Sequence, residues 1–261
     1  EKNHKAIRSI AEAGHEIGNH SFNHEPWLHL YTEEDIVKDL SAAEEILTKV
    51  TGQKPIGFRG PGYSLSKRVL HVLQTRGYKY DCSTLPTFLG PLARMYYFMT
   101  TKLSDEEKEK RKKLFGTLSE GFRSLKPYQW SVNGETIYEV PVTTMPIFKI
   151  PIHLSYILYA ATISPILAKL YFRIALLLCR LTGVQPSILL HPLDFMTLED
   201  VPELGFFPAM QMPLDKKLDI VNGVLKLLTA QYNVVSMKEH VGSLNVNLAT
   251  VAPEFKALEQ T

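Results

Sequence analysis

The first third of the chain alternates two kinds of apolar pattern, and this alternation restricts the fold more than any other feature of the sequence. Residues 4–13 and 32–51 place apolar side chains three and four positions apart, as helices that pack on a core do. Residues 66–76 have the same pattern, whereas residues 55–59 and 78–82 are short apolar runs. Helices and strands in alternation are typical of parallel sheets and α/β barrels. We therefore expect an α/β fold.

Composition excludes several classes of protein. The 261 residues are 45% hydrophobic and 21% charged, which is typical of a globular domain and unlike a disordered, collagenous or multi-span membrane chain. The 29 basic and 27 acidic residues give a net charge of +2, too small to attract nucleic acid by charge alone, so we expect no nucleic-acid partner. Cys82 and Cys179 match no zinc or redox spacing and are expected to be free thiols in the core.

The alternation breaks between about residues 92 and 182, which we interpret as a segment inserted into a single domain of residues 1–261. Within this segment, Ser104 and Glu107 have the spacing of a capping box, and the charged sequence after them predicts a solvent-exposed helix. Residues 135–142 alternate in the manner of a strand.

After the inserted segment the alternation returns. Residues 187–191 are an apolar run that ends in a histidine, and we predict a strand there. Residues 212–231 have the apolar spacing of a helix, and residues 232–236 predict a last strand. These elements extend the expected α/β body on the far side of the insertion.

Residues 154–181 are the most apolar stretch of the chain. A membrane span needs about 20 uninterrupted apolar residues. Pro165, Lys169, Arg173 and Arg180 interrupt this stretch, so we predict an amphipathic helical hairpin instead. The hairpin either packs on its own domain or lies in a lipid interface, and both interpretations stay open. The second would give a peripheral membrane contact, at the cytoplasmic face or in the envelope.

Four histidines, His15, His20, His24 and His29, lie close together in the sequence. His20 and His24 are four positions apart, so one helical turn or one tight corner could direct both rings at a single ion. Neutral imidazoles in such a pair suit zinc or a similar divalent metal. The pair alone is equally compatible with two hydrogen-bonded structural histidines, because a catalytic zinc usually has three protein ligands.

Three motifs resemble those of one family. Residues 14–24, Gly-His-Glu-Ile-Gly-Asn-His-Ser-Phe-Asn-His, closely resemble the metal-binding motif of the NodB-like polysaccharide deacetylases, carbohydrate esterase family four. Residues 58–64, Phe-Arg-Gly-Pro-Gly-Tyr-Ser, are similar to the family's next motif, and residues 189–192, Leu-Leu-His-Pro, to its late motif. The motifs occur in the family's order, and the resemblance covers most of the chain except the inserted segment.

The resemblance implies a role for each histidine of these motifs. His20 and His24 would hold a divalent metal, expected to be zinc, which polarises an amide carbonyl and lowers the pKa of a bound water. His191 would be the general acid that protonates the leaving amine. Structural readings remain open, and for His191 this is a buried histidine at a strand end.

The second motif implies a groove beside the metal. Arg59 would hold the carboxylate base ionised and oriented, although a loop-bracing arginine is the other reading. Pro61, Gly62 and Tyr63 would contact the substrate, and a backbone N–H of the Gly62–Tyr63 pair would bind the oxyanion. The family places an aromatic residue directly after the proline, where this chain has Gly62.

Two departures from the family matter. Its first motif, a strand end that supplies the catalytic base and the third metal ligand, does not occur in this sequence. We therefore expect an N-terminally truncated chain that binds zinc weakly and hydrolyses little. Asp81 lies near the position of an acidic motif but without its spacing, and is either a groove residue or a strand-end turn former.

The fold that the resemblance implies is a distorted (β/α) barrel of the seven-stranded deacetylase type, with its first strands missing and a helical insert. The function it implies is metal-dependent hydrolysis that removes an acetyl or formyl group from an amino sugar, in a polysaccharide or a lipid-linked saccharide. The alternative is a non-catalytic carbohydrate- or lipid-binding module that kept the barrel. An acylated amino sugar is the expected partner in the first case, and we infer no protein partner.

Overall fold

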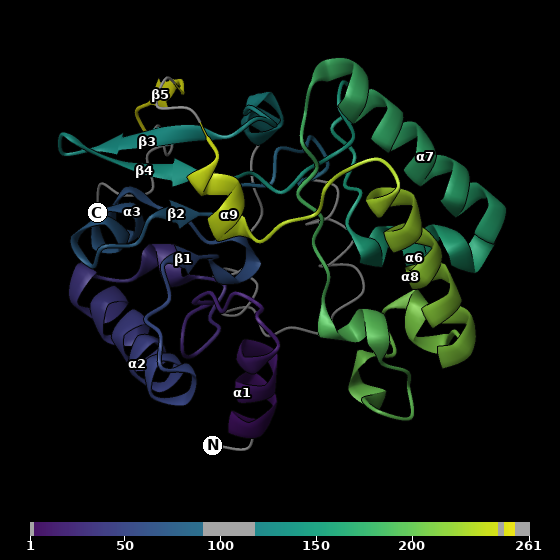
Figure 1. The fold of residues 1–261 in the computed structure, drawn as a ribbon, viewed down its shortest axis with the longest axis horizontal. Helices are drawn as coiled ribbons and strands as arrows, with labels where there is room; N and C mark the ends of the chain where they lie inside the picture. Colours follow the sequence, from purple (N-terminus) through teal and green to yellow (C-terminus); the bar gives the residue numbers. More distant parts are fainter. Residues whose placement is uncertain (1–2, 91–117, 245–247, 254–261) are drawn as a thin grey trace, which may run out of the picture.

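The computed structural model describes residues 3–90, 118–244 and 248–253. Figure 1 shows a sheet with flanking helices on one side of the molecule and a group of helices on the other. The sheet side contains α1 (His4–Glu12), α2 (Glu33–Thr51), β1 (Gly57–Phe58), α3 (Lys67–Thr75), β2 (Tyr80–Asp81), β3 (Tyr128–Val132), β4 (Glu135–Glu139), α9 (Met237–Gly242) and β5 (Thr250–Val251). The helical side contains α6 (Leu154–Ile163), α7 (Pro165–Thr182) and α8 (Leu214–Thr229). The helix predicted to begin near Ser104 lies outside the described residues.

The described strands form one mixed sheet in the order β1-β2-β4-β3-β5. β1 and β2 are parallel, as are β2 and β4, while β3 is antiparallel to β4 and parallel to β5. The predicted α/β architecture is therefore confirmed. Because β1, β2 and β4 run in the same direction, their carboxyl ends meet at one edge of the sheet, where α/β proteins commonly place their sites.

Local sequence signals account for the helices around this sheet. The Thr32 hydroxyl accepts a hydrogen bond from the Asp35 amide at 3.2 Å and caps α2, which Gly52 ends at a φ of 74°. Ser66 caps α3 in the same way, through the Val69 amide. The apolar faces of both helices pack on β1, β3 and β4 in one core, whose fully buried members include Leu28, Ile36, Leu40, Phe58, Val69, Leu70, Leu73 and Trp130.

The hairpin of β3 and β4 was only half predicted, because residues 128–132 were not expected to form a strand. Asn133 and Gly134 connect the two strands and have φ values of 52° and 87°. Positive φ at both central residues is the type I′ turn, for which Asn-Gly is the preferred sequence. That dipeptide was the overlooked signal.

Two predicted strands are wrong. Residues 187–191 are not part of the described sheet. The Ser187 amide donates to the Thr143 hydroxyl at 2.7 Å, so it is not available for a backbone hydrogen bond to a neighbouring strand. Residues 232–236 form a turn and an irregular segment before α9. In both cases a short apolar run was taken for a strand although it pairs with no neighbouring strand of the described sheet.

The predicted hairpin in residues 154–181 is confirmed as α6 and α7. Ser164 separates the two helices, its hydroxyl accepts from the Leu167 amide at 3.3 Å, and Pro165 occupies the first turn of α7. Both helices pack with α8 around Phe172 and Leu176 in a second core. None of the helices in the described part of the chain is long and apolar enough to cross a membrane. Both cysteines are free and buried, as expected.

Two glycine substitutions, one in the β3–β4 turn and one in α8, should change the free energy of unfolding in opposite directions. Gly134→Ala should destabilise the protein by about 1 kcal/mol, because a Cβ disfavours the positive φ of the turn. Gly223→Ala should stabilise it by up to about 1 kcal/mol, because Gly223 lies inside α8 with open space around its Cα. Urea denaturation of both variants measures the difference. A destabilising Gly223→Ala, or a neutral Gly134→Ala, would contradict the assignment.

Candidate functional site

The predicted metal-binding histidines lie on a tight turn at the carboxyl-end edge of the sheet. Asn19 precedes the turn and pairs with β1, since its amide donates to the Gly57 carbonyl at 2.9 Å and its carbonyl accepts from the Arg59 amide at 3.1 Å. Ser21 and His24 have positive φ values of 63° and 56°, which L-residues adopt only when their surroundings impose them. The sheet therefore fixes where the turn begins.

Two buried side chains hold this turn from beneath. Asp39 of α2 accepts from the backbone amides of Phe22 and Asn23 at 2.9 and 3.0 Å. Asn19 accepts from the Ser21 amide and donates to the Leu40 carbonyl and the Tyr78 hydroxyl, at 2.9, 3.1 and 2.7 Å. The polar groups of the turn are thus satisfied by the protein itself, which stabilises its unusual backbone.

The rings of His20 and His24 face one another with their centroids 4.8 Å apart. The Nδ1 atom of His20 lies 2.6 Å from the Arg59 carbonyl, which can only accept, so Nδ1 carries the proton and the Nε2 lone pair is left for a ligand. This tautomer suits a metal ligand. Among the residues that the structure describes, no three His, Cys, Asp or Glu side chains lie close enough together to hold a metal ion. Among the described residues, His20 and His24 could therefore supply two ligands to a metal ion and no third.

The other two histidines of the cluster do not join this pair. His29 is hydrogen-bonded to Ser64, with 2.8 Å between Nδ1 and the hydroxyl oxygen, and so has a structural role. His15 is exposed.

His191, predicted from its position after an apolar run, is brought to the same side as His20. The two rings are close enough to interact electrostatically, and both interact with Arg59. His153, which no motif indicated, lies beside His191 with 5.7 Å between ring centroids, and Tyr156 follows at 4.5 Å from His153. Residues from distant parts of the sequence thus form one region, called here the histidine region: His20, His24, Arg59, His153 and His191.

Burial and nearby positive or titratable groups favour the neutral form of the His20, His153 and His191 rings. Burial lowers the pKa of His20 below its ordinary value, and the neighbouring His24 and Arg59 lower it further. Burial likewise lowers the pKa of His191, although Asp194 acts in the opposite direction. For His153, burial together with His191 and Arg59 lowers the pKa to about 3. Neutral imidazoles are the form that binds a metal.

Arg59 and the glycine-proline loop after it form one wall of this region. The Nε atom of Arg59 donates to the Cys82 carbonyl at 3.0 Å. This hydrogen bond holds the guanidinium group beside the residue that follows β2. Gly62 has a φ of 57°, and a Cβ there would lie 3.0 Å from the Pro26 ring, so only glycine fits without strain. The Tyr63 amide donates to the Gly60 carbonyl at 3.0 Å and is thereby committed to the turn.

A serine and an aspartate hold His191 from behind, and neither was predicted. The Ser155 hydroxyl lies 3.1 Å from Nδ1 of His191 and donates to Oδ1 of Asp194 at 2.7 Å. The other carboxylate oxygen of Asp194 accepts from the His191 amide at 2.8 Å, and Asp194 is fully buried. Asp194 lies three positions after His191, which is a capping spacing visible in the sequence, whereas Ser155 is brought in only by the fold.

Two further buried carboxyl groups lie under this edge of the sheet. Asp81 and Glu139 end the neighbouring strands β2 and β4, are fully buried and are hydrogen-bonded to each other. Burial, together with the charge of Asp81, holds the pKa of Glu139 well above its ordinary value, so the pair retains a proton. Asp81 accepts from the Ser83 amide at 3.1 Å, which favours the turn-forming reading over the groove reading.

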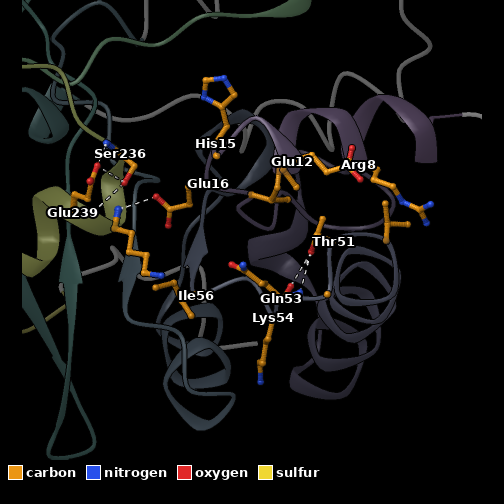
Figure 2. A pocket seen from close by; sticks show the side chains of 16 residues that line it. Arg8, Glu12, His15, Glu16, Thr51, Gln53, Lys54, Ile56, Ser236 and Glu239 are labelled. Carbon is orange, nitrogen blue, oxygen red and sulfur yellow. Dashed lines mark hydrogen bonds between the residues drawn. The ribbon is translucent and has the colours of Figure 1, made fainter.

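A cavity of about 690 Å³ lies elsewhere, between α1, the segment before β1 and the start of α9. Figure 2 shows its lining side chains coming from separate elements without converging on one point. Glu16 crosses part of it, because its carboxylate accepts from the Tyr80 hydroxyl at 2.5 Å and from the Lys238 amide at 2.8 Å. None of the histidine region lines this cavity, so we place the candidate chemistry at the histidine region and not here.

The first third of the chain is similar in sequence to known proteins. Residues 1–80 match the family model of polysaccharide deacetylase. A peptidoglycan deacetylase from Helicobacter pylori is 32% identical over 87 residues, which are 33% of this chain and 29% of that protein. A peptidoglycan deacetylase-like protein from Gibberella zeae is 32% identical over 93 residues, 34% of this chain and 25% of that protein. The matched region thus spans less than a third of either relative.

The similarity in three dimensions extends further than the similarity in sequence. A crystal structure from Mycobacterium smegmatis, of a protein assigned to the polysaccharide deacetylases, covers 92% of this chain and 66% of its own with a TM-score of 0.58 and 20% identity. At that identity the likeness shows the fold, which is the predicted deacetylase fold. The class is thus a mixed α/β protein of this type. Over its first 80 residues, the chain is similar in sequence to polysaccharide deacetylases.

Removal of the Asp194 charge tests the arrangement around His191. Asp194→Asn should lower the pKa of His191 further, because the carboxylate raises it against the effect of burial. NMR titration of the histidine ring protons measures the shift, with His191→Gln identifying the resonance. Asp200→Asn, an exposed residue nearby, is the control and should leave the titration unchanged. An unchanged or raised pKa in Asp194→Asn would refute the placement.

The burial of His153 predicts a dependence of stability on pH. Its folded pKa of about 3 lies below the ordinary 6.5, so between these values the unfolded chain binds more protons. The resulting contribution to stability is complete above pH 6.5 and falls as the pH is lowered, by up to about 1.4 kcal/mol per pH unit. His153→Asn should remove this part of the slope in urea denaturation. The exposed His15→Asn should retain it, and equal slopes in all three proteins would contradict the burial of His153.

Proposed function

We propose that the protein is a metal-dependent hydrolase that removes an N-acyl group, acetyl or formyl, from an amino sugar. The observation that carries this proposal is the meeting of His20, His24, Arg59 and His191 from three separate motifs at one edge of the sheet. The similarity of residues 1–80 to polysaccharide deacetylases supports the reaction class. The metal, expected to be zinc, would be held by Nε2 of His20 and by His24, and when bound would supply a Lewis acid and an activated water.

The chain's own residues would bind and orient the substrate. Gly62 is the better oxyanion donor of the pair considered, because the Tyr63 amide already donates within the turn. Arg59 would contribute a permanent positive charge close to the developing oxyanion, and Pro61 and Tyr63 would line the groove. Burial raises the pKa of the Tyr63 phenol to about 12, so this side chain stays a neutral hydrogen-bond donor.

His191 would protonate the leaving amine. Because its pKa lies below the ordinary value, most His191 rings are neutral near pH 7 and must first take a proton. Ser155 and Asp194 would favour that step, since the carboxylate stabilises the charged ring through the hydroxyl between them. We assign the general base and the third metal ligand to none of the described residues.

The substrate remains one of two classes, a polysaccharide or a lipid-linked saccharide. A peripheral membrane contact through residues 154–181 would favour the second. A non-catalytic carbohydrate- or lipid-binding module is the alternative function, and one observation favours it: the described residues offer two metal ligands where catalytic zinc sites usually have three.

Substitutions of single histidines separate metal binding from proton transfer. His20→Ala or His24→Ala should weaken zinc binding in calorimetry by at least about 100-fold and abolish release of amines from N-acetylated chito-oligosaccharides. His191→Ala should bind zinc as the wild type does and lower the small turnover that is expected of this chain. His15→Ala is the exposed control. Tight substrate binding without any turnover in the wild type would favour the binding module, and zinc binding unaffected by both alanine variants would exclude the proposed site.

A further inference from the structure

The outer face of α7 carries a row of large apolar side chains that no described part of the protein covers. Its members are three or four positions apart and therefore lie along one face of the helix: Ile166, Leu170, Ile174, Leu177 and Leu181. Ile166 is 82% exposed and Leu181 72%. In Figure 1, α7 forms the outer edge of the molecule on the side away from the sheet. This set is called here the outer row.

The outer row lies opposite the part of α7 that packs on the protein. The residues buried against α6 and α8 are spaced so that they lie half a turn away, and they include Ala168, Phe172 and Cys179. The exposed apolar side chains are thus additional to the core contacts. Such a row is larger than the scattered apolar residues of an ordinary surface, and it marks an interaction site.

All the charges beside the outer row have one sign. Lys169, Arg173 and Arg180 are exposed and form a second row directly next to it. Residues 154–182 contain no aspartate or glutamate. A helix with an apolar face flanked only by cations has the pattern that lies in the interface of an anionic bilayer, with the aliphatic stems partly immersed and the charges among the headgroups.

Helix α6 connects the outer row to the histidine region. At the start of α6, His153 and Tyr156 belong to the wall of the histidine region. The 10 residues of α6 then rise about 15 Å to the hairpin turn, where the outer row begins.

We infer that the outer row and its cations dock on an anionic lipid bilayer and bring the histidine region to the membrane surface. This inference rests on the proposed function only for the substrate, which would then be an acylated amino sugar carried on a lipid. The docking is peripheral, because no described helix can span a bilayer. The lipid is favoured over a second copy of the chain because the charged row beside the outer row is entirely cationic, so two such rows brought together would repel one another.

Vesicle flotation with the full chain tests the inference. The wild type should float with vesicles of phosphatidylcholine mixed with phosphatidylglycerol and bind much less to phosphatidylcholine alone. Lys169→Gln with Arg173→Gln should weaken binding about fivefold for each residue. Leu170→Glu with Ile174→Glu should abolish it. Val234→Glu with Val235→Glu removes two exposed apolar side chains away from α7 and should float as the wild type does.

Three further measurements separate loss of membrane binding from unfolding, from self-association and from loss of hydrolysis. Circular dichroism melting shows whether each variant is folded, which is expected because every substituted side chain is exposed. Light scattering without vesicles reports the oligomeric state, and a dimer that Leu170→Glu with Ile174→Glu converts to a monomer would overturn the inference in favour of a subunit interface. His20→Ala should still float, so that failure of docking and failure of hydrolysis are read separately. Absence of flotation by the folded wild type at low salt overturns the inference.

Discussion

Two carboxyl groups, Asp81 and Glu139, are fully buried at the ends of adjacent parallel strands, and the edge of the sheet that carries the site is organised around them. Two charges so close in a low-dielectric interior would be very unfavourable, so the pair keeps a proton and surrounds itself with donors. Glu139 accepts from the Trp130 indole at 2.9 Å and from the Thr84 amide at 3.1 Å. These hydrogen bonds connect β2, β3, β4 and the segment after β2 at one place.

Arg59 gives the site its electrostatic character. Its positive charge interacts with Asp81 and with three histidines, His20, His153 and His191. The guanidinium thus helps the sheet to tolerate buried carboxyl groups and, at the same time, disfavours protonation of these three rings. Neutral imidazoles have the lone pairs that a metal needs, whereas imidazolium rings do not. The permanent positive charge of Arg59 suits an oxyanion.

Sequence reasoning found the parts of this arrangement that are encoded locally. The helices in residues 32–51 and 66–76 and the hairpin in residues 154–181 depend on residues near one another in the chain, so patterns reveal them. It missed Ser155 and His153 because they reach His191 only through the packing of α6. It placed strands at residues 187–191 and 232–236 because an apolar run does not reveal whether a neighbouring strand is present. The Asn133–Gly134 turn, by contrast, was local and could have been found.

The turn that carries His20 and His24 has a consequence for how the protein would handle its ion. Asn19 and Asp39 already satisfy its amides, and the positive φ values of Ser21 and His24 are imposed by these contacts and not by a ligand. The turn is already ordered by these hydrogen bonds, so binding of a metal ion should cost little conformational entropy. A chelator should accordingly remove the ion without unfolding the protein, in contrast to small zinc domains, which unfold when their metal is removed.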